Sequence, residues 1–183
     1  NVGNKALGKD IQASGNFAGN ISVNGIFAGL GHTIQDISIT NKSDNTGVFS
    51  LINSNSELRD LGLINLNISS KGNIGGFTGI NNGIIRNSYI EGGKIEGTNN
   101  YIGGAVGTNN GYISNVYINL EVTPKNNTTA YVGGVAGVNN SSIKNSYSTG
   151  IVKGNRSIGW LVKKQEKWEI LNSYSTSVVT LKG

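Results

Sequence analysis

The sequence predicts an all-β chain folded as a right-handed parallel β-helix, a solenoid of about six coils with roughly 28 residues each. Two observations predict this fold. The sequence repeats with that period, and periods of about 20 to 50 residues indicate a solenoid, a propeller or an array. The composition is the second observation, because 28 glycines supply turns while Ile, Val and Tyr favour strands. No long segment shows helical spacing, and a propeller blade needs about 40 residues, so the β-helix fits better.

The repeat is carried by five segments that each begin at a glycine. Their starts are 28, 28, 30 and 26 residues apart, at Gly47, Gly75, Gly103, Gly133 and Gly159. The three most regular copies read GGFTGINNGIIRNSYI, GGAVGTNNGYISNVYI and GGVAGVNNSSIKNSYS. Each copy is predicted to place an apolar strand at the Gly-Gly pair, a turn at Asn-Asn-Gly and a second strand through Asn-Ser-Tyr. A third extended piece, such as the IEGGKIEG that follows Tyr89, closes the coil.

Stacking of such coils places equivalent residues above one another, about 4.8 Å apart. One apolar column is predicted to face the core and consists of Ile74, Ile102, Val132 and Ile158. Strand alternation then turns the preceding residues outward, namely Asn73, Tyr101, Tyr131 and Ser157. A column of amides that can hydrogen-bond along the stack, with Asp60 beneath it, consists of Asn87, Asn115, Asn145 and Asn172. A tyrosine column consists of Tyr89, Tyr117, Tyr147 and Tyr174.

The repeat pattern divides a single β-helical segment, residues 1–183, into three parts. Residues 1–46 form the first coils and contain a GHTI sequence, and residues 47–158 hold the regular repeats. Residues 159–183 form an irregular last coil, in which Lys-Lys-Gln-Glu-Lys-Trp replaces Gly-Asn-Asn. We expect the chain to be a piece of a longer helix, because it begins and ends inside the pattern. It has no cysteine, so packing rather than disulfides is expected to stabilise it.

These segments resemble the GLUG motif of bacterial surface proteins, which the blocks GGFTGINNG, GGAVGTNNG and GGVAGVNNS carry together with the following NSY or NVY. The stretch IFAGLGHTIQDISI is similar to the coil that often precedes such repeats, and KALGKDIQASGNFAG resembles a coil of filamentous-haemagglutinin-like adhesins. The resemblance covers about Lys5 to Val179. It implies a β-helical adhesin at the bacterial cell surface or secreted, exported by two-partner secretion through an outer-membrane partner. GLUG repeats also occur beside catalytic domains in some immunoglobulin proteases.

Catalysis is not expected from these residues. Glycoside hydrolysis needs two carboxylates that face one bond, whereas the 10 acidic residues are scattered along the chain. Asp60 with Arg59 and Arg86 is the nearest approach to a lyase-like cluster. His32 is the only histidine, so it can build neither a histidine-rich metal site nor a triad, and it is predicted to hold a turn. The sequence therefore predicts no enzyme, no cofactor and no metal site.

A binding surface is the better expectation. The net charge is +5, but the cations are scattered rather than gathered on one element, so nucleic acid is not an expected partner. Aromatic faces stack on sugar rings, and neighbouring lysines attract a carboxylated or sulfated sugar. The predicted ligand-binding residues are Tyr101, Tyr131, Trp160, Lys163, Lys164, Lys167 and Trp168. The alternative is that the tyrosines only cover the sheet and the tryptophans cap the end of the stack.

Several asparagines lie in the N-x-Ser/Thr sequence that N-glycosylation requires. The chain has eight such sites, a mild excess over the number expected by chance. The excess gains weight beside the resemblance, because some high-molecular-weight adhesins are glycosylated at such sites. The predicted sites are Asn20, Asn41, Asn67, Asn126, Asn127, Asn139, Asn140 and Asn155.

Three functions remain open at this point. The first is an adhesin segment, expected to be a monomer, that binds a host cell-surface glycoconjugate, sialylated or sulfated, or a matrix protein. The second is a structural spacer whose repeats only set length. The third is a non-catalytic flank of a secreted protease or glycan-processing enzyme.

Overall fold

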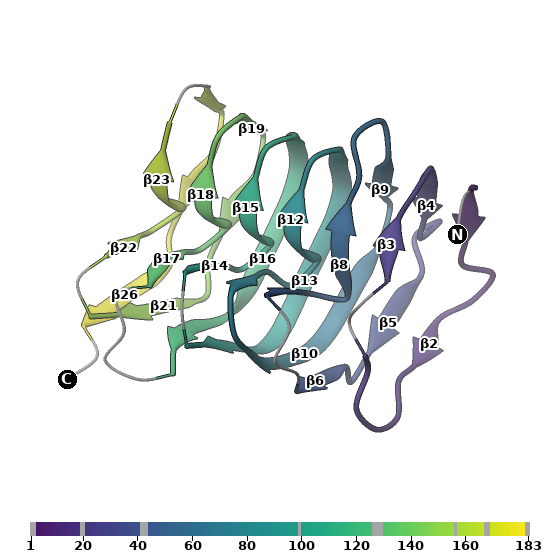
Figure 1. Cartoon of the computed structure of the whole chain (residues 1–183), viewed down its shortest axis with the longest axis horizontal. Coiled ribbons are helices and arrows are strands. Elements are labelled where there is room, and N and C mark those ends of the chain that lie inside the picture. Colours follow the sequence, from purple (N-terminus) through teal and green to yellow (C-terminus); the bar gives the residue numbers. More distant parts are fainter. Residues whose placement is uncertain are drawn as a thin grey trace.

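The chain folds into the predicted right-handed parallel β-helix. A computed structural model describes residues 3–18, 21–40, 44–98, 100–125, 130–155, 157–166 and 169–181. Figure 1 shows the coils side by side along the long axis, with the two termini at opposite ends. Neighbouring coils pair through parallel strands, and six strands stack in one of the sheets, which makes about five complete turns. No helix within the described ranges has the length and apolar character needed to cross a membrane.

Three sheets form the sides of the solenoid in the described part of the chain. The five-stranded sheet contains β7 (Asn45–Thr46), β11 (Asn73–Ile74), β14 (Tyr101–Gly103), β17 (Tyr131–Gly133) and β22 (Ile158–Gly159). The six-stranded sheet contains β3 (Ser22–Val23), β8 (Phe49–Ile52), β12 (Thr78–Asn81), β15 (Val106–Asn109), β18 (Ala136–Asn139) and β23 (Val162–Gln165).

The large sheet covers the remaining sides. It contains β1 (Lys5–Ala6), β2 (Ile11–Gln12), β4 (Ile26–Ala28), β5 (Thr33–Gln35), β6 (Ser38–Thr40), β9 (Glu57–Arg59), β10 (Gly62–Ser70), β13 (Ile84–Gly97), β16 (Tyr112–Pro124), β19 (Ser142–Lys144), β20 (Tyr147–Ser148), β21 (Ile151–Gly154), β24 (Ile170–Leu171), β25 (Tyr174–Ser175) and β26 (Val178–Leu181).

The long strands of the large sheet turn a corner at a single residue. Asn87 in β13 and Asn115 in β16 have φ of 49° and 52°, in the left-handed region that asparagine tolerates better than most residues. Asp60, Asn145 and Asn172 adopt the same conformation in the coils below and above. The predicted amide column is therefore also the corner of the solenoid, and the strand pairing continues on both sides of it.

The predicted apolar column is confirmed. Ile74 pairs with Ile102, Ile102 with Val132 and Val132 with Ile158. The first three side chains are completely buried, while Ile158 is half-buried and packs against the core. The residues that precede them are half-buried on the outer side, as alternation requires: Asn73, Tyr101, Tyr131 and Ser157.

The Gly-Gly pair lies where the predicted strand ends and the chain turns. Gly103 and Gly133 are the last residues of β14 and β17, and the glycine after each lies at the corner between the five-stranded and six-stranded sheets. In the coil before them, Gly75 and Gly76 both lie at this corner, between β11 and β12. A Cβ atom on Gly75 would lie 2.3 Å from Val106 Cα, and one on Gly103 would lie 2.0 Å from the Val106 carbonyl oxygen. The corner is too tight for a side chain, which explains why the repeat begins with glycine.

The Asn-Asn-Gly turn contains a buried amide ladder that sequence reasoning missed. Asn81 Nδ2 donates to Asn109 Oδ1 at 2.8 Å, and Asn109 Nδ2 donates to Asn139 Oδ1 at 2.6 Å. All three side chains are completely buried. Asn139 Nδ2 in turn donates to Gln165 Oε1 at 2.8 Å. Each side-chain amide hydrogen-bonds to the amide of the neighbouring coil. These polar groups can therefore lie inside the solenoid, because the donors and acceptors that face each other are paired.

The second asparagine of the turn forms a parallel ladder on the outside. Asn110 Nδ2 donates to Asn82 Oδ1 at 2.9 Å, and Asn140 Nδ2 donates to Asn110 Oδ1 at 2.8 Å. Asn82 and Asn110 are exposed, so these bonds form in competition with water and are worth less than those of the buried ladder.

The serine of Asn-Ser-Tyr points inward and bonds the backbone of the neighbouring coil. Ser88 Oγ accepts from the Leu61 amide at 3.2 Å, and Ser146 Oγ accepts from the Val116 amide at 3.2 Å. The three residues of this motif thus have three different roles. Asparagine turns the corner, serine satisfies buried backbone, and tyrosine stands on the outer surface.

The last coil keeps the register of the coils before it. Val162 and Gln165 of β23 pair with Ala136 and Asn139 of β18, and Gln165 continues the amide ladder in place of asparagine. The substituted sequence therefore disturbs this strand less than expected up to Glu166. Lys167 and Trp168 lie outside the described residues.

The apolar column yields a first prediction. Val132→Asp places a carboxylate between Ile102 and Ile158, with no partner, and we expect it to cost about 4 kcal/mol or more of unfolding free energy. Thermal and urea unfolding followed by circular dichroism measure this loss. Tyr131→Asp, one residue earlier on the outer side, is the matched control and should cost much less. A Val132→Asp chain that unfolds at the parent's midpoint would contradict the proposed core.

The two amide ladders yield a second prediction. Asn109→Ala leaves Asn81 Nδ2 and Asn139 Oδ1 buried without their partner, so we expect a loss of about 2–3 kcal/mol. Asn110→Ala removes the adjacent, exposed rung and should cost less than about 1 kcal/mol. Urea unfolding of the two variants under identical conditions compares them directly, and equal losses would refute the assignment of one ladder to the interior.

Candidate functional site

The two tyrosines predicted to bind a ligand lie side by side on the five-stranded sheet. Tyr101 of β14 pairs with Tyr131 of β17. Their ring centroids are 5.5 Å apart and the ring planes make an angle of 63°, which is an edge-to-face contact. Both residues are half-buried. One ring supports the other, so the pair offers a fixed aromatic surface rather than two mobile side chains.

A lysine of the neighbouring sheet lies beside this pair. Lys164, on β23, pairs with Val138 of β18 and is exposed. The Glu166 carboxylate raises the pKa of Lys164, because it accepts a hydrogen bond from the ammonium group and carries a negative charge, and Tyr101 and Tyr131 act weakly in the same direction. Lys164 therefore stays protonated at neutral pH. The ion pair with Glu166 offsets part of its charge, so the surface is only moderately cationic.

The other predicted contact residues are less closely associated. Trp160 lies between β22 and β23 with 65% of its surface exposed. Its backbone is held by the coil below, because its carbonyl oxygen accepts from the Gly134 amide at 3.2 Å and from Ser148 Oγ at 3.3 Å. No ring contact joins it to either tyrosine in the described part of the chain. Lys163 is half-buried. The structure thus brings together Tyr101, Tyr131 and Lys164.

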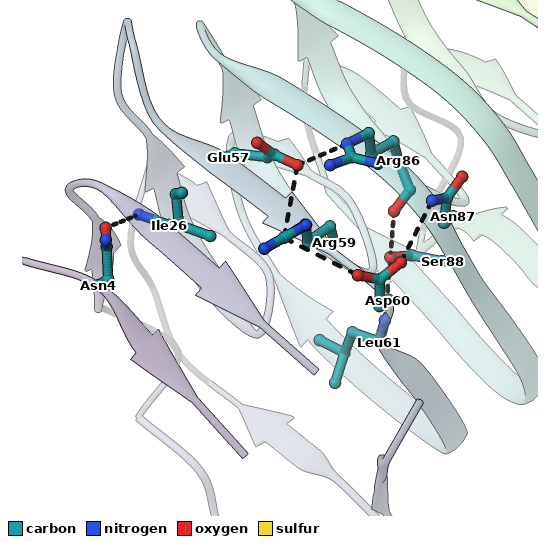
Figure 2. Close-up of polar contacts among 9 residues, drawn as sticks. All are labelled: Asn4, Ile26, Glu57, Arg59, Asp60, Leu61, Arg86, Asn87 and Ser88. Carbon is teal, nitrogen blue, oxygen red and sulfur yellow. Dashed lines mark hydrogen bonds and ion pairs between the residues drawn. The ribbon is translucent and has the colours of Figure 1, made fainter. Parts of the chain in front are cut away.

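The cluster of acidic and basic residues around Asp60 bridges neighbouring coils, as Figure 2 shows. Glu57 Oε1 lies 2.5 Å from Arg86 Nε and 3.7 Å from Arg59 Nε. Asp60 Oδ2 lies 3.8 Å from Arg59 Nε, and Asp60 Oδ1 accepts from Asn87 Nδ2 at 3.2 Å. Each carboxylate faces a guanidinium group rather than the other carboxylate. This geometry joins coils and does not place two carboxylates across an open space, as glycoside hydrolysis requires.

His32 also joins two coils. Its Nδ1 lies 3.2 Å from Asp10 Oδ1, and the same oxygen accepts from the Thr33 amide at 2.8 Å. The Thr33 amide, followed by the His32 side chain, holds the pKa of Asp10 below its usual value. The histidine amide donates to the Gly29 carbonyl within the turn at 2.9 Å, in line with the predicted turn role. Within the described residues no three His, Cys, Asp or Glu side chains gather closely enough to bind a metal ion.

A second surface feature follows the corner of the large sheet. The asparagine column and the tyrosine column border a shallow groove of about 310 Å³, in which Asn87, Tyr89, Asn115 and Tyr117 lie on neighbouring coils. Sequence reasoning identified both columns but not the groove between them. A larger cavity of about 600 Å³ opens at the N-terminal end of the solenoid and is lined mainly by apolar residues of the first coil.

The predicted glycosylation sites differ in accessibility. Asn67 is exposed on β10, and Asn140 and Asn155 are half-buried. Asn139 is completely buried in the inner amide ladder, so the folded chain does not expose its amide at the surface. The remaining four, Asn20, Asn41, Asn126 and Asn127, lie outside the described residues.

Comparison with known proteins supports the repeat and the fold. Residues 128–153 match the GLUG motif family. The crystal structure of a Bacteroides ovatus protein described as a "putative immunoglobulin A1 protease" aligns with a TM-score of 0.72 and 17% sequence identity, over 97% of this chain and 70% of that one. No curated protein matches the chain in sequence. At this identity the structural match shows the fold alone, and the resemblance to filamentous-haemagglutinin-like adhesins stays a prediction. The chain is a parallel β-helix that carries the GLUG motif.

Proposed function

We propose that this chain is part of a secreted or surface-exposed bacterial protein and attaches to acidic glycans on host cells. The observation that carries the proposal is the Tyr101–Tyr131 pair with the Lys164 ammonium beside it. Tyrosine rings offer an apolar face to the C–H side of a pyranose ring, and an adjacent cation attracts a sialic-acid carboxylate or a sulfate. Neither tyrosine is needed to fill the core, since the side chains that do so belong to the next residues, Ile102 and Val132.

The shape of the solenoid suits an attachment role. Its sides are sheets, so recognition takes place on shallow features rather than in a deep pocket. Such contacts are individually weak, because a small exposed ion pair or aromatic contact contributes about 1 kcal/mol. Useful affinity then comes from repeated contacts with a multivalent surface, as is typical for adhesion. The GLUG match and the fold shared with the Bacteroides ovatus protein support a location outside the cell.

The Bacteroides ovatus match also favours a second candidate function. That protein is described as a protease, and its alignment with nearly the whole of this chain raises the option that the present β-helix is a non-catalytic part of a secreted protease. In that case the surface of Tyr101 and Tyr131 would position the whole protein on a glycosylated substrate. The two candidates share the same binding surface and differ in what accompanies it.

Binding can be tested on the surface described above. We expect the chain to bind sialylated or sulfated probes on a glycan array and to bind epithelial cells, with weaker binding as salt rises above physiological strength. The Tyr101→Ala/Tyr131→Ala double variant should lose most of this binding. Tyr112→Ala, which removes a half-buried tyrosine from the large sheet, is the matched control. Circular dichroism of each variant confirms that the fold is kept.

The opposite outcome is equally clear. If the folded double variant binds the acidic probes and the cells as strongly as the parent, the surface at Tyr101 and Tyr131 is not the attachment site. Absence of any binding by the parent would favour the spacer, in which the repeats only set length.

We also expect no lyase or hydrolase activity on pectin, hyaluronan or other uronates, with or without calcium. The support is the pairing of Glu57 and Asp60 with arginines instead of with each other. Absorbance of unsaturated uronate products provides the measurement. Products that appear with the parent and vanish with Asp60→Asn would overturn this expectation.

A further inference from the structure

We infer a second ligand site, distinct from the acidic-glycan surface, in the groove between the asparagine and tyrosine columns of the large sheet. It would take one ring of a neutral, extended polysaccharide in a slot between Tyr89 and Tyr117, with the rest of the polysaccharide lying along the columns. The inference goes beyond the proposed function and does not depend on it.

The slot arises from an irregularity in the tyrosine column. Tyr117 and Tyr147 have ring centroids 4.7 Å apart, and Tyr147 and Tyr174 stack at 5.1 Å with an interplanar angle of 7°. Tyr89 pairs with Tyr117 along the backbone, yet no ring contact joins these two among the described residues. The space between the Tyr89 and Tyr117 rings is open, although their two strands pair in the same way as those of the other coils.

The cause of this opening is the glycine in the coil below. Gly62 is the partner of Tyr89 in β10, and a Cβ atom there would lie 2.6 Å from Tyr89 Cζ and 2.7 Å from its hydroxyl oxygen. The ring of Tyr89 therefore leans over Gly62 and covers the backbone that a side chain would otherwise cover. Because Tyr89 leans away from Tyr117, the face of Tyr117 that is not stacked on Tyr147 borders the groove.

The asparagine column supplies hydrogen-bonding groups along the same groove. Asn115 Nδ2 donates to Asn87 Oδ1 at 3.0 Å, so one N–H and one lone pair of this contact are used between coils. Each amide has two N–H groups and an oxygen with two lone pairs, so each exposed asparagine retains capacity for a ligand. Paired donors and acceptors on one amide match the hydroxyl groups of a sugar, which also donate and accept.

The spacing and the charge of the groove select the ligand class. Coils repeat at about 4.8 Å, close to the advance of one residue in an extended β-linked pyranose chain, so each coil can meet one sugar. The residues that line the groove are asparagine, serine, valine and tyrosine, none of which is charged at neutral pH. A volume of about 310 Å³ is at the lower end of the range for small-molecule sites and suits one or two sugar residues. The match is to a neutral polysaccharide rather than to an acidic one.

The test uses the chain of residues 1–183 with chitotetraose, cellotetraose and xylotetraose as probes, followed by ligand-observed NMR and calorimetry. We expect at least one of these neutral tetrasaccharides to bind, with the same affinity below and above physiological salt. Tyr117→Ala removes the ring face, and Asn115→Gly removes the amide while keeping a residue that adopts positive φ easily. Each should weaken binding roughly tenfold, and Tyr112→Ala, on the same strand but outside the groove, should have no effect.

Two results would overturn the inference. One is a parent chain that binds none of the three tetrasaccharides. The other is unchanged binding by Tyr117→Ala and Asn115→Gly when circular dichroism shows both to be folded. Because the probes carry no charge, neither result bears on the acidic-glycan surface, which is tested with sialylated and sulfated probes.

Discussion

The parallel hydrogen-bond ladder between coils is the interaction on which the other features of this molecule depend. It holds each residue directly above its equivalent in the preceding repeat, as the long pairing of β13 with β16 illustrates. In this register, many side chains contact a side chain of the same type in the neighbouring coil. Ile102 meets Val132, Asn81 meets Asn109, and Tyr147 meets Tyr174. Residues that pack well in one coil therefore also pack well in the next, because every coil has the same register.

The same register makes buried polarity tolerable. An isolated asparagine in an apolar core would leave its amide without partners, at a cost of a few kcal/mol. In a stack, each amide donates to the next and accepts from the previous one, so only the ends of the column need another solution. Gln165 provides one at the last described rung by reaching the amide of Asn139. Inward-facing serines serve the backbone in the same way beside the corner asparagines of the large sheet. The buried polar residues of the motif thus stabilise the fold by hydrogen bonds between coils.

The repeat predicted a large part of this structure, and the limits of that prediction are instructive. The columns of Ile74, Asn87 and Tyr89 follow directly from alignment of the repeats, because residues that align in sequence pair with one another in neighbouring coils. The strand predicted at the Gly-Gly pair ends at its first glycine in β14 and β17, and the corner that follows was not predicted, because glycine spacing does not reveal where a chain stops extending and turns. The buried ladder was missed because either asparagine of Asn-Asn-Gly can face inward, and the corner geometry decides which. The groove depends on Gly62, which lies in a coil whose sequence departs from the motif.

The direction of the inter-coil bonds has a mechanical consequence. These bonds run parallel to the long axis, since the strands lie across it (Figure 1). A tensile force applied evenly across a coil is shared by all the bonds of that coil, so the solenoid resists stretching as a rod. A force applied to one end of the chain instead loads the bonds one after another, as in a zipper. The first described coil pairs through β1, β2 and β3, which have two residues each, whereas β13 and β16 pair along most of their length. Under a pulling load the short pairings of β1, β2 and β3 should therefore open before the long pairing of β13 with β16.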